Sequence, residues 1–269
     1  MTFSFDLISD LHIETWDSFD WTGQPTAPYC IVAGDVAENL DVLVQVLTHL
    51  GQQYRGVFYI DGNDEHSQRL NELVASYREL DRAIKNIPHV VYLQENVILI
   101  EDVAILATNG WWSYDFDNTI DAEQTVEWYK EKAQVDHATA VGINGIAYND
   151  AAYIINSLHK LQQHNDVNAI ILVSHTVPRA ELIEHDIDLV DTYRFNCMGS
   201  RPLQYALDED TERKIKAWCF GHYHKPVDQM IDGIRYVNNC RGRGDTPWKQ
   251  TAYYPKRIVI KYWLSAFGL

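Results

Sequence analysis

The sequence predicts an α/β protein, because short apolar runs typical of buried strands alternate with segments that carry apolar residues at helical spacing. The clearest run covers residues 29–33, Tyr-Cys-Ile-Val-Ala, and its apolar character throughout is typical of a strand buried on both faces. The chain can also form a large core, since 46% of its 269 residues are hydrophobic and 22% are charged. We therefore expect a folded protein rather than a disordered one.

The charge and the cysteines restrict the class of protein further. The chain has 22 basic and 38 acidic residues, and its formal net charge of −16 repels polyanions, which argues against long nucleic acid as a partner. No apolar run reaches the length of a membrane span, and no N-terminal targeting signal is visible. The four cysteines show no C-x-x-C spacing. We expect a soluble, reduced, cytoplasmic protein that does not enter a membrane.

Strands and helices alternate in the first part of the chain. The expected elements are strands at 3–8, 29–33 and 57–60, a helix at 39–51, a helix at 67–86, and a hairpin of strands 97–100 and 103–107. Asn39 is a suitable N-cap for the first helix, and Gly51 is expected to end it. A strand, helix, strand order of this kind favours parallel pairing in a sheet.

The second part of the chain returns to buried strands after a helical region. The expected elements are helices at 121–138 and 147–163, strands at 169–173 and 217–220, a hairpin of strands 227–231 and 234–238, and a final strand at 257–264. The stretch 178–202 looks irregular. Candidate ligands extend from residue 10 to residue 224, so that cutting the chain would divide the site. We therefore expect a single domain over 1–269.

The region of about 109–165 differs in character, and we expect it to be a helical insertion or cap over or beside the site. It begins with a group of aromatic residues, Trp111, Trp112, Tyr114 and Phe116. These rings could form a wall that stacks on an aryl group or base of a substrate. The favoured interpretation is ordinary packing between helix and sheet, because aromatic residues also dominate protein cores.

Polar residues of the types that bind metals follow five of the apolar runs. They are Asp10 and His12, Asp35, Asn63, His175, and His222 and His224. Side chains two residues apart in an extended segment point the same way, so Asp10 and His12 can contact one ion together. A carboxylate at the end of a buried strand needs a cation or several donors. The five strand ends therefore predict one polar site.

These fragments, in this order, resemble the calcineurin-like metallophosphoesterase superfamily. The matching motifs are Asp10-x-His12, Gly34-Asp35, Gly62-Asn63-Asp64-Glu65, His175 and Gly221-His222-Tyr223-His224, within roughly residues 3–240. The resemblance implies a four-layer α/β/β/α sandwich of two mixed sheets. It also implies a two-metal site in which Asp10, His12 and His224 hold one ion. Asn63, His175 and His222 would hold the other, and Asp35 would bridge both.

The ligand types agree with this assignment on chemical grounds. Carboxylate, imidazole and amide ligands suit Mn²⁺, Fe²⁺ or Zn²⁺. A bridging carboxylate can hold two cations about 3.5–4 Å apart, the separation found in two-metal phosphatases and nucleases. Hydroxide bridging the two ions would then attack phosphorus in line, while the ions neutralise charge on the phosphoryl oxygens.

The sequence departs from the family where a proton donor is expected. The family usually has histidine directly after the Asn of Gly-Asn-x-Glu, and that histidine is the group thought to protonate the leaving oxygen. Here the residue is Asp64, which should be ionised at neutral pH and a poor acid. His66 lies two residues further on and could replace the missing acid. The alternative is that His66 is a surface residue at the start of the next helix.

The predicted function is hydrolysis of small or exposed phosphate mono- or diesters by a binuclear metal centre. An arginine outside the metal shell is expected to hold the phosphate, and the candidates are Arg201, Arg241 and Arg243; a solvated surface arginine is the alternative. One alternative function is a nuclease, which the charge of −16 disfavours. Another is a non-catalytic or impaired metal-binding homologue, which only Asp64 suggests.

Overall fold

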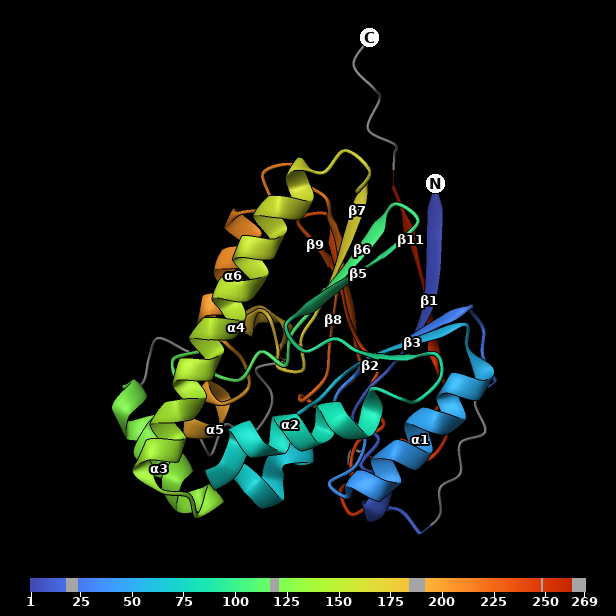
Figure 1. Cartoon of the computed structure of the whole chain (residues 1–269). Helices are drawn as coiled ribbons and strands as arrows, with labels where there is room; N and C mark the ends of the chain where they lie inside the picture. The colour runs from blue at the N-terminus through green and yellow to red at the C-terminus, as the bar shows by residue number, and fades with distance from the viewer. Residues whose placement is uncertain (18–23, 117–120, 184–191, 248, 263–269) are drawn as a thin grey trace.

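Two β-sheets form the centre of the protein (Figure 1). The computed structural model describes residues 1–17, 24–116, 121–183, 192–247 and 249–262. The first sheet has the order β11-β1-β2-β3-β4, and the second has the order β5-β6-β7-β8-β10-β9. Strands β1 to β4 pair in parallel, as do β6, β7, β8 and β10, while β11, β5 and β9 are antiparallel to their neighbours. Both sheets are therefore mixed.

The elements have the following bounds. The strands of the first sheet are β1 (Thr2–Ile8), β2 (Tyr29–Ala33), β3 (Gly56–Ile60), β4 (Val90–Tyr92) and β11 (Lys256–Lys261). Those of the second are β5 (Asn96–Ile100), β6 (Val103–Ala107), β7 (Ala169–Val173), β8 (Ile215–Phe220), β9 (Val227–Ile231) and β10 (Ile234–Asn238). The α-helices are α1 (Leu40–Gln53), α2 (Leu73–Ile84), α3 (Ala122–Ala133), α4 (His137–Gln163), α5 (Thr192–Asn196) and α6 (Arg201–Asp208). Short 3₁₀ segments cover Ile13–Thr15, Asp64–Glu72 and Ala180–Leu182.

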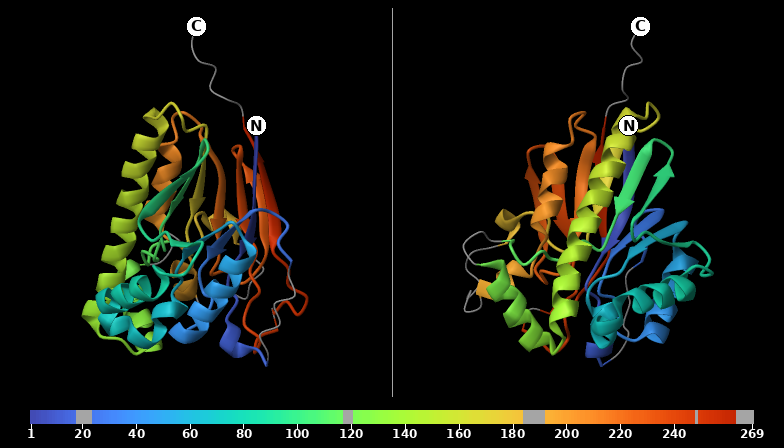
Figure 2. Two further views of the ribbon diagram at one scale, coloured as in Figure 1. Left: turned by 45° about the vertical axis from the view of Figure 1, so that its right-hand side comes forward. Right: turned by 60° about the vertical axis from the view of Figure 1, so that its left-hand side comes forward.

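Alternate residues of each strand face different layers, which gives three stacked cores. One core lies between the sheets and includes Leu7, Ile31, Ile171 and Val237. A second packs the first sheet on α1 and α2, with Val32, Tyr59, Leu47 and Leu80. A third packs the second sheet on α4 and α6, with Leu172, Trp218, Ile154 and Leu203. The resulting four layers confirm the expected α/β/β/α sandwich, and Figure 2 shows the helices on its two outer sides.

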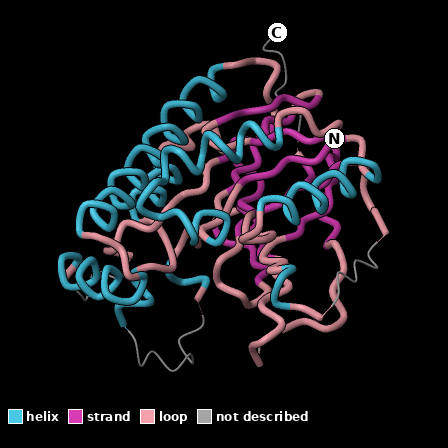
Figure 3. Tube along the Cα trace, turned by 60° about the horizontal axis from the view of Figure 1, so that its bottom comes forward, coloured by secondary structure: helices cyan, strands magenta, loops and turns pink. Residues whose placement is uncertain are grey.

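The parallel strands of both sheets end at one edge of the sandwich. Bonds between the segments that follow them join the two sheets there: Ser9 pairs with Cys240, the Gly242 amide donates to Asp10 O, and His175 Nδ1 lies 2.9 Å from Ala33 O. Figure 3 turns this end forward and shows loops and helices around it. Loops at the carboxyl ends of parallel strands are a common place for binding sites. The five strand ends chosen from the sequence all lie here.

Several expected boundaries were wrong for identifiable reasons. Helix α1 continues past Gly51 to Gln53, and a Cβ at Gly51 would overlap the Pro88 carbonyl oxygen, so this glycine serves close packing rather than termination. The expected helix at 67–86 is divided into the 3₁₀ segment and α2, because Arg69 within that segment and Glu72 at its end have non-helical backbone angles. Helix α4 begins at His137 rather than at 147, with the Asp136 side chain accepting from the Thr139 amide.

Two further elements were not expected from the sequence, and one expected strand is only partly described. The short edge strand β4 was not expected, and neither was α6 within the stretch that looks irregular. The final strand ends at Lys261, and residues 263 and 264 of the expected strand lie outside the described residues. None of the helices that the structure describes is both long and apolar enough to cross a membrane. The four cysteines are buried free thiols.

Candidate metal centre

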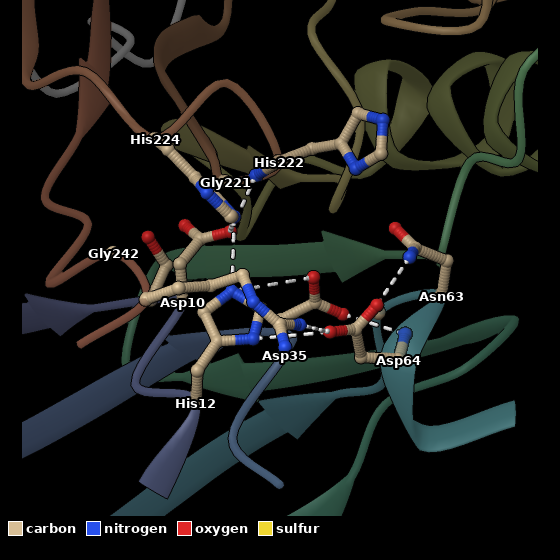
Figure 4. Close-up of polar contacts among 12 residues, drawn as sticks. Asp10, His12, Asp35, Asn63, Asp64, Gly221, His222, His224 and Gly242 are labelled. Atoms are coloured by element: carbon tan, nitrogen blue, oxygen red, sulfur yellow. Dashed lines mark hydrogen bonds and ion pairs between the residues drawn. The ribbon is translucent and has the colours of Figure 1, made fainter. Parts of the chain in front are cut away.

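The structure brings all seven predicted ligand residues together at the carboxyl edge of the two sheets. Their positions follow from the strands: Asp10 and His12 after β1, Asp35 after β2, Asn63 after β3, His175 after β7, and His222 and His224 after β8. Figure 4 shows most of them converging from separate strands. Their side chains form two groups that could each hold a metal ion, and one carboxylate belongs to both.

The first group consists of Asp10, His12, Asp35 and His224, whose ligand atoms all lie within 4.8 Å of one another. The Nε2 atoms of His12 and His224 face each other at 2.9 Å, and His224 Nε2 lies 3.5 Å from Asp10 Oδ1. Two imidazole nitrogens at this distance must share a proton or direct their lone pairs at a common cation. Oδ2 of Asp10 is buried and has no hydrogen-bond partner among the described residues, so a cation suits this group.

The second group consists of Asp35, His175 and His222. Oδ2 of Asp35 lies 3.3 Å from His175 Nε2 and 3.8 Å from His12 Nε2, so this oxygen is shared by both groups. Asn63 Oδ1 lies 3.2 Å from His175 Nε2, which adds the amide oxygen that the sequence predicts for this site. The donor set of carboxylate, imidazole and amide fits divalent transition metals.

Hydrogen bonds behind the histidines fix which ring nitrogen faces the centre. His175 Nδ1 lies 2.9 Å from the Ala33 carbonyl oxygen, so it is the donor and Nε2 is the nitrogen directed at Asp35. His222 Nε2 lies 3.0 Å from the Cys197 carbonyl oxygen, which leaves Nδ1 for a metal. Metal-binding histidines characteristically use their second nitrogen in this way. The orientation of the histidine rings therefore favours metal binding, in addition to the types of the ligand residues.

Burial and mutual charge shift the pKa values of the ligand groups. Burial tends to lower the pKa of His175, but the Asp35 carboxylate outweighs it and raises this pKa to about 10. For His12, burial is likewise outweighed by the nearby carboxylates of Asp64 and Asp35, and the pKa rises to about 9. Burial and the charge on His175 lower the pKa of His222 to about 3. In the metal-free protein, protons thus occupy positions that cations would take.

The backbone at the centre is strained. Five of the seven residues have left-handed φ values: Asp10 at 50°, His12 at 41°, Asp35 at 53°, His222 at 65° and His224 at 55°. Residues other than glycine adopt this region at a cost of about 1–3 kcal/mol each, and such strain concentrates at functional sites. This observation supports a functional site independently of the ligand types.

Glu65 ties the loops of the centre together, a role that the sequence did not suggest. Its carboxylate accepts hydrogen bonds from the backbone amides of Asp35 at 3.1 Å, Val36 at 2.7 Å and Gly62 at 2.7 Å. The sequence signal that could have pointed to this role is the position of Glu65 in the Gly-Asn-x-Glu fragment. Gly62 allows the close approach, because a Cβ there would overlap Asp35 Oδ1 and lie 2.7 Å from the Asp35 amide nitrogen.

His66 is not the surface residue that the sequence analysis considered. It is fully buried, with Nε2 at 2.9 Å from Asp61 Oδ2 and Nδ1 at 2.8 Å from Ser76 Oγ. Asp61 also accepts from Tyr92 OH at 2.5 Å and from Asn109 Nδ2 at 2.6 Å. Asn109 in turn accepts from the His175 amide. These contacts form a buried hydrogen-bond network beneath the ligand residues. Both ring nitrogens of His66 take part in it.

Of the three candidate arginines, the structure places Arg243 in the cleft with the predicted ligands. Arg241 is 6% exposed, and its guanidinium lies over the Trp16 ring at 3.9 Å from the centroid, away from that cleft. Arg201 is the first residue of α6, and its amide donates to Ser113 Oγ at 3.0 Å. Of the three candidates, Arg243 is therefore the one whose side chain lines the cleft with the predicted ligands.

The cleft over the centre has a volume of about 340 Å³, within the range of small-molecule sites. One wall is aromatic and includes Trp112, Trp128 and Tyr129. Trp112 stacks on the His222 ring with centroids 5.6 Å apart, and it is buried, as are Trp111, Tyr114 and Phe116. The aromatic group is thus mainly core, as favoured from the sequence. Whether 109–165 is an insertion relative to the family remains a prediction.

Comparison with known proteins identifies the fold. No family model matches the sequence, and no curated protein is similar enough to match. Among solved structures, a phosphopantetheinyl hydrolase from Mycobacterium tuberculosis superposes with a TM-score of 0.68 over 90% of each chain, at 21% sequence identity. A dimetal phosphatase from Danio rerio superposes with a TM-score of 0.52 over 91% of this chain and 89% of that chain, at 13% identity. The chain has the calcineurin-like metallophosphoesterase fold, as the sequence resemblance implies.

Proposed function

We propose that the protein is a metal-dependent phosphoesterase that uses two divalent ions to hydrolyse small or exposed phosphate mono- or diesters. The observation that carries this proposal is Asp35, whose Oδ2 atom is shared by two groups of histidine and carboxylate ligands. The fold supports it, because the solved structures that share the fold include a dimetal phosphatase. Two ions bound in this way would lower the pKa of water and neutralise charge on the phosphoryl oxygens.

The residues have separate tasks in this proposal. Asp10, His12 and His224 hold one ion, Asn63, His175 and His222 hold the other, and Asp35 holds both. Buried contacts keep the side chains in place before substrate binds, which avoids reorganisation during the reaction. Glu65 and Gly62 keep the loop after β2 beside the loop after β3. The metal could be Mn²⁺, Fe²⁺ or Zn²⁺, since all three accept these ligands.

The cleft indicates which part of a substrate each wall would contact. Arg243 lies beside the ligands and can donate hydrogen bonds to an ester oxygen of a phosphate. The aromatic wall of Trp112, Trp128 and Tyr129 suits a flat or apolar leaving group. Lys132 and Arg194 also line the cleft and form no ion pair with another described residue, so an anionic group on the substrate would be attracted there. A negatively charged ester of moderate size fits these features.

Hydrolysis by the reconstituted protein tests the proposal. The chelated protein should be inactive and should recover turnover with Mn²⁺, Fe²⁺ or Zn²⁺ on a panel of aryl mono- and diesters. A phosphopantetheinyl ester belongs in the panel, because a hydrolase of that name shares the fold. Two bound ions without turnover of any substrate would indicate a metal-binding scaffold. Salt-dependent cleavage of single-stranded DNA alone would indicate a nuclease.

A further inference from the structure

Asp64 occupies the position at which the resembled family has its proton-donating histidine, and the structure shows what its carboxylate contacts. Oδ2 lies 3.1 Å from His12 Nδ1 and 3.2 Å from Arg243 Nη1. Oδ1 accepts from Asn63 Nδ2 at 2.7 Å, and the Asp64 amide donates to Asp35 Oδ1 at 2.9 Å. Figure 4 shows Asp64 between Asn63 and His12. The residue that replaces the acid is thus bonded to both metal groups.

The contact with His12 gives Asp64 a role in the metal site. Asp64 Oδ2 forms an ion pair with His12 Nδ1, although this nitrogen makes no hydrogen bond of standard geometry with a described residue, and a carboxylate on this side of the ring leaves Nε2 as the nitrogen available as a ligand. His12 Nε2 is the atom that faces His224 and Asp35. Asp64 therefore acts on the centre through His12. The described contacts of its carboxylate are with His12, Arg243 and Asn63, and none of them would supply a proton to a substrate in the cleft.

The contact with Arg243 places a permanent positive charge beside the position of the missing acid. Besides Asp64, the guanidinium faces Asp245 at 3.4 Å and Glu38 at 3.8 Å. Its side chain is 33% exposed and lines the cleft, so it is held in place yet open to a ligand. An arginine remains protonated in proteins and cannot give up a proton, but it can donate hydrogen bonds to an oxyanion.

We propose that Asp64 is a positioning residue for Arg243 and His12, and that the Arg243 guanidinium, rather than a proton donor, meets the leaving oxygen. This inference rests on the proposed function. Hydroxide forms the new P–O bond as the bond to the leaving oxygen breaks. The electron pair of that bond goes to the leaving oxygen, which departs as an anion beside Arg243 and takes a proton from water afterwards. The substrate class is then esters and anhydrides with stable leaving anions, such as aryl, enol or phosphate groups.

The dependence of kcat/KM on leaving-group pKa tests this inference, measured with aryl and alkyl esters and saturating Mn²⁺. The wild-type protein should show a steep dependence. Arg243→Ala should lower kcat/KM about 10–100-fold, the worth of a charge-assisted hydrogen bond, with the largest loss for the most basic leaving groups. Added guanidinium ion should restore part of this loss, which a purely structural role would not allow. Arg235→Ala is the matched control, since Arg235 pairs with Asp228 outside the cleft and its loss should change nothing.

Two Asp64 variants separate its effects on His12 and Arg243. Asp64→Asn keeps a side chain of the same size beside His12 but loses the charge that holds Arg243, so bound metal should be retained while kcat/KM falls. Asp64→His should flatten the leaving-group dependence by supplying an acid. A shallow wild-type dependence that Arg243→Ala leaves unchanged would overturn the inference, and metal-dependent turnover would still leave the proposed function standing. Absence of metal-dependent turnover in the wild-type protein would overturn both.

Discussion

At the scale of single residues, the centre depends most on Asp35. Its carboxylate is 2% exposed and lies beside both His12 and His175. Burial would raise its pKa, but the charge on His175 outweighs this and holds the pKa well below the ordinary value. An ionised carboxylate in this position is surrounded by cationic partners, as a bridging ligand requires.

We expect Asp35→Asn to reduce bound metal below two ions per chain and to lower kcat/KM by at least about 100-fold, because an amide is a weaker ligand than a carboxylate. Elemental analysis and turnover of an aryl ester measure the two effects. Asp41→Asn, an exposed change in the first turn of α1, is the control. Full metal content and full activity in Asp35→Asn would refute the bridging role.

His66 should matter for stability rather than for proton transfer. Removing its ring leaves the buried Asp61 carboxylate without the hydrogen bond from Nε2, and an unsatisfied buried polar group typically costs about 1–3 kcal/mol. We expect His66→Ala to lower the free energy of unfolding by about this amount, measured in urea. His137→Ala, at an exposed pair with Glu127, should change it by less than about 0.5 kcal/mol.

The same variant distinguishes the two roles considered for His66. If the ring only orders the network, the folded fraction of His66→Ala should show the wild-type dependence of rate on leaving-group pKa. A steeper dependence would instead identify His66 as a proton donor. Both ring nitrogens are already hydrogen-bonded, so we expect no change.

At the scale of elements, the site depends on how closely the loops after β2, β3 and β8 approach one another. Gly34 has a φ of 84°, and its Cβ would lie 2.8 Å from the Gly62 amide nitrogen. A Cβ at Gly221 would lie 2.8 Å from both Ala33 O and Asp10 Oδ2. Real Cβ atoms essentially never approach so closely, so these loops can meet only where side chains are absent.

We expect Gly62→Ala to displace Asp35 and to reduce both metal content and turnover by about 10–100-fold, the range for disturbed ligand orientation. Gly145→Ala is a matched control in α4, where a Cβ would meet nothing within 4 Å. This control should keep full activity and gain about 0.5–1 kcal/mol of stability, because alanine favours a helix. Normal metal binding in Gly62→Ala would contradict the packing argument.

Strand ends and caps could be predicted from sequence because local chemistry determines them. The run at 29–33 is apolar throughout and coincides with β2, and Asn39 does accept from the amides of Asp41 and Val42. The division of the helix at 67–86 could not be predicted. Tertiary contacts determine it: Glu65 and His66 are held by the loop after β2 and by Asp61, which overrides helical spacing.

At the scale of the whole molecule, the order of the motifs carried the family resemblance that implied the sandwich, and the strand ends predicted that their polar residues form one site. The three-residue strand β4 was missed because so short a run has no periodicity. The choice among arginines also required the structure, since it depends on which loop packs on Trp16 and which faces the cleft. Sequence patterns give residue types at strand ends, whereas side-chain direction follows from packing between distant segments.

The pKa shifts of the whole centre predict how metal binding responds to pH. The pKa values of His12 and His175 are raised to about 9 and about 10 in the metal-free protein. Their contribution to stability is therefore complete below about pH 6.5, the ordinary value for histidine, and is lost as pH rises through 9 and 10. A metal ion needs the neutral ring, so it must displace these protons.

We expect Mn²⁺ binding at pH 8 to release protons and to tighten as pH rises toward 9. Calorimetry in two buffers of different ionisation enthalpy measures the number released. The chelated protein should lose thermal stability between pH 7.5 and 9.5, while the metal-loaded protein should keep it, because ligand binding stabilises the folded state. Binding without proton release would show that the histidines are already neutral.

Anomalous diffraction from crystals grown with Mn²⁺, recorded on both sides of the manganese absorption edge, tests the two-metal centre most directly. The structure predicts two peaks per chain. One should lie among Asp10, His12 and His224 and the other among Asn63, His175 and His222, with Asp35 between them. A single peak, or two peaks of which neither contacts Asp35, would contradict the bridged two-metal centre.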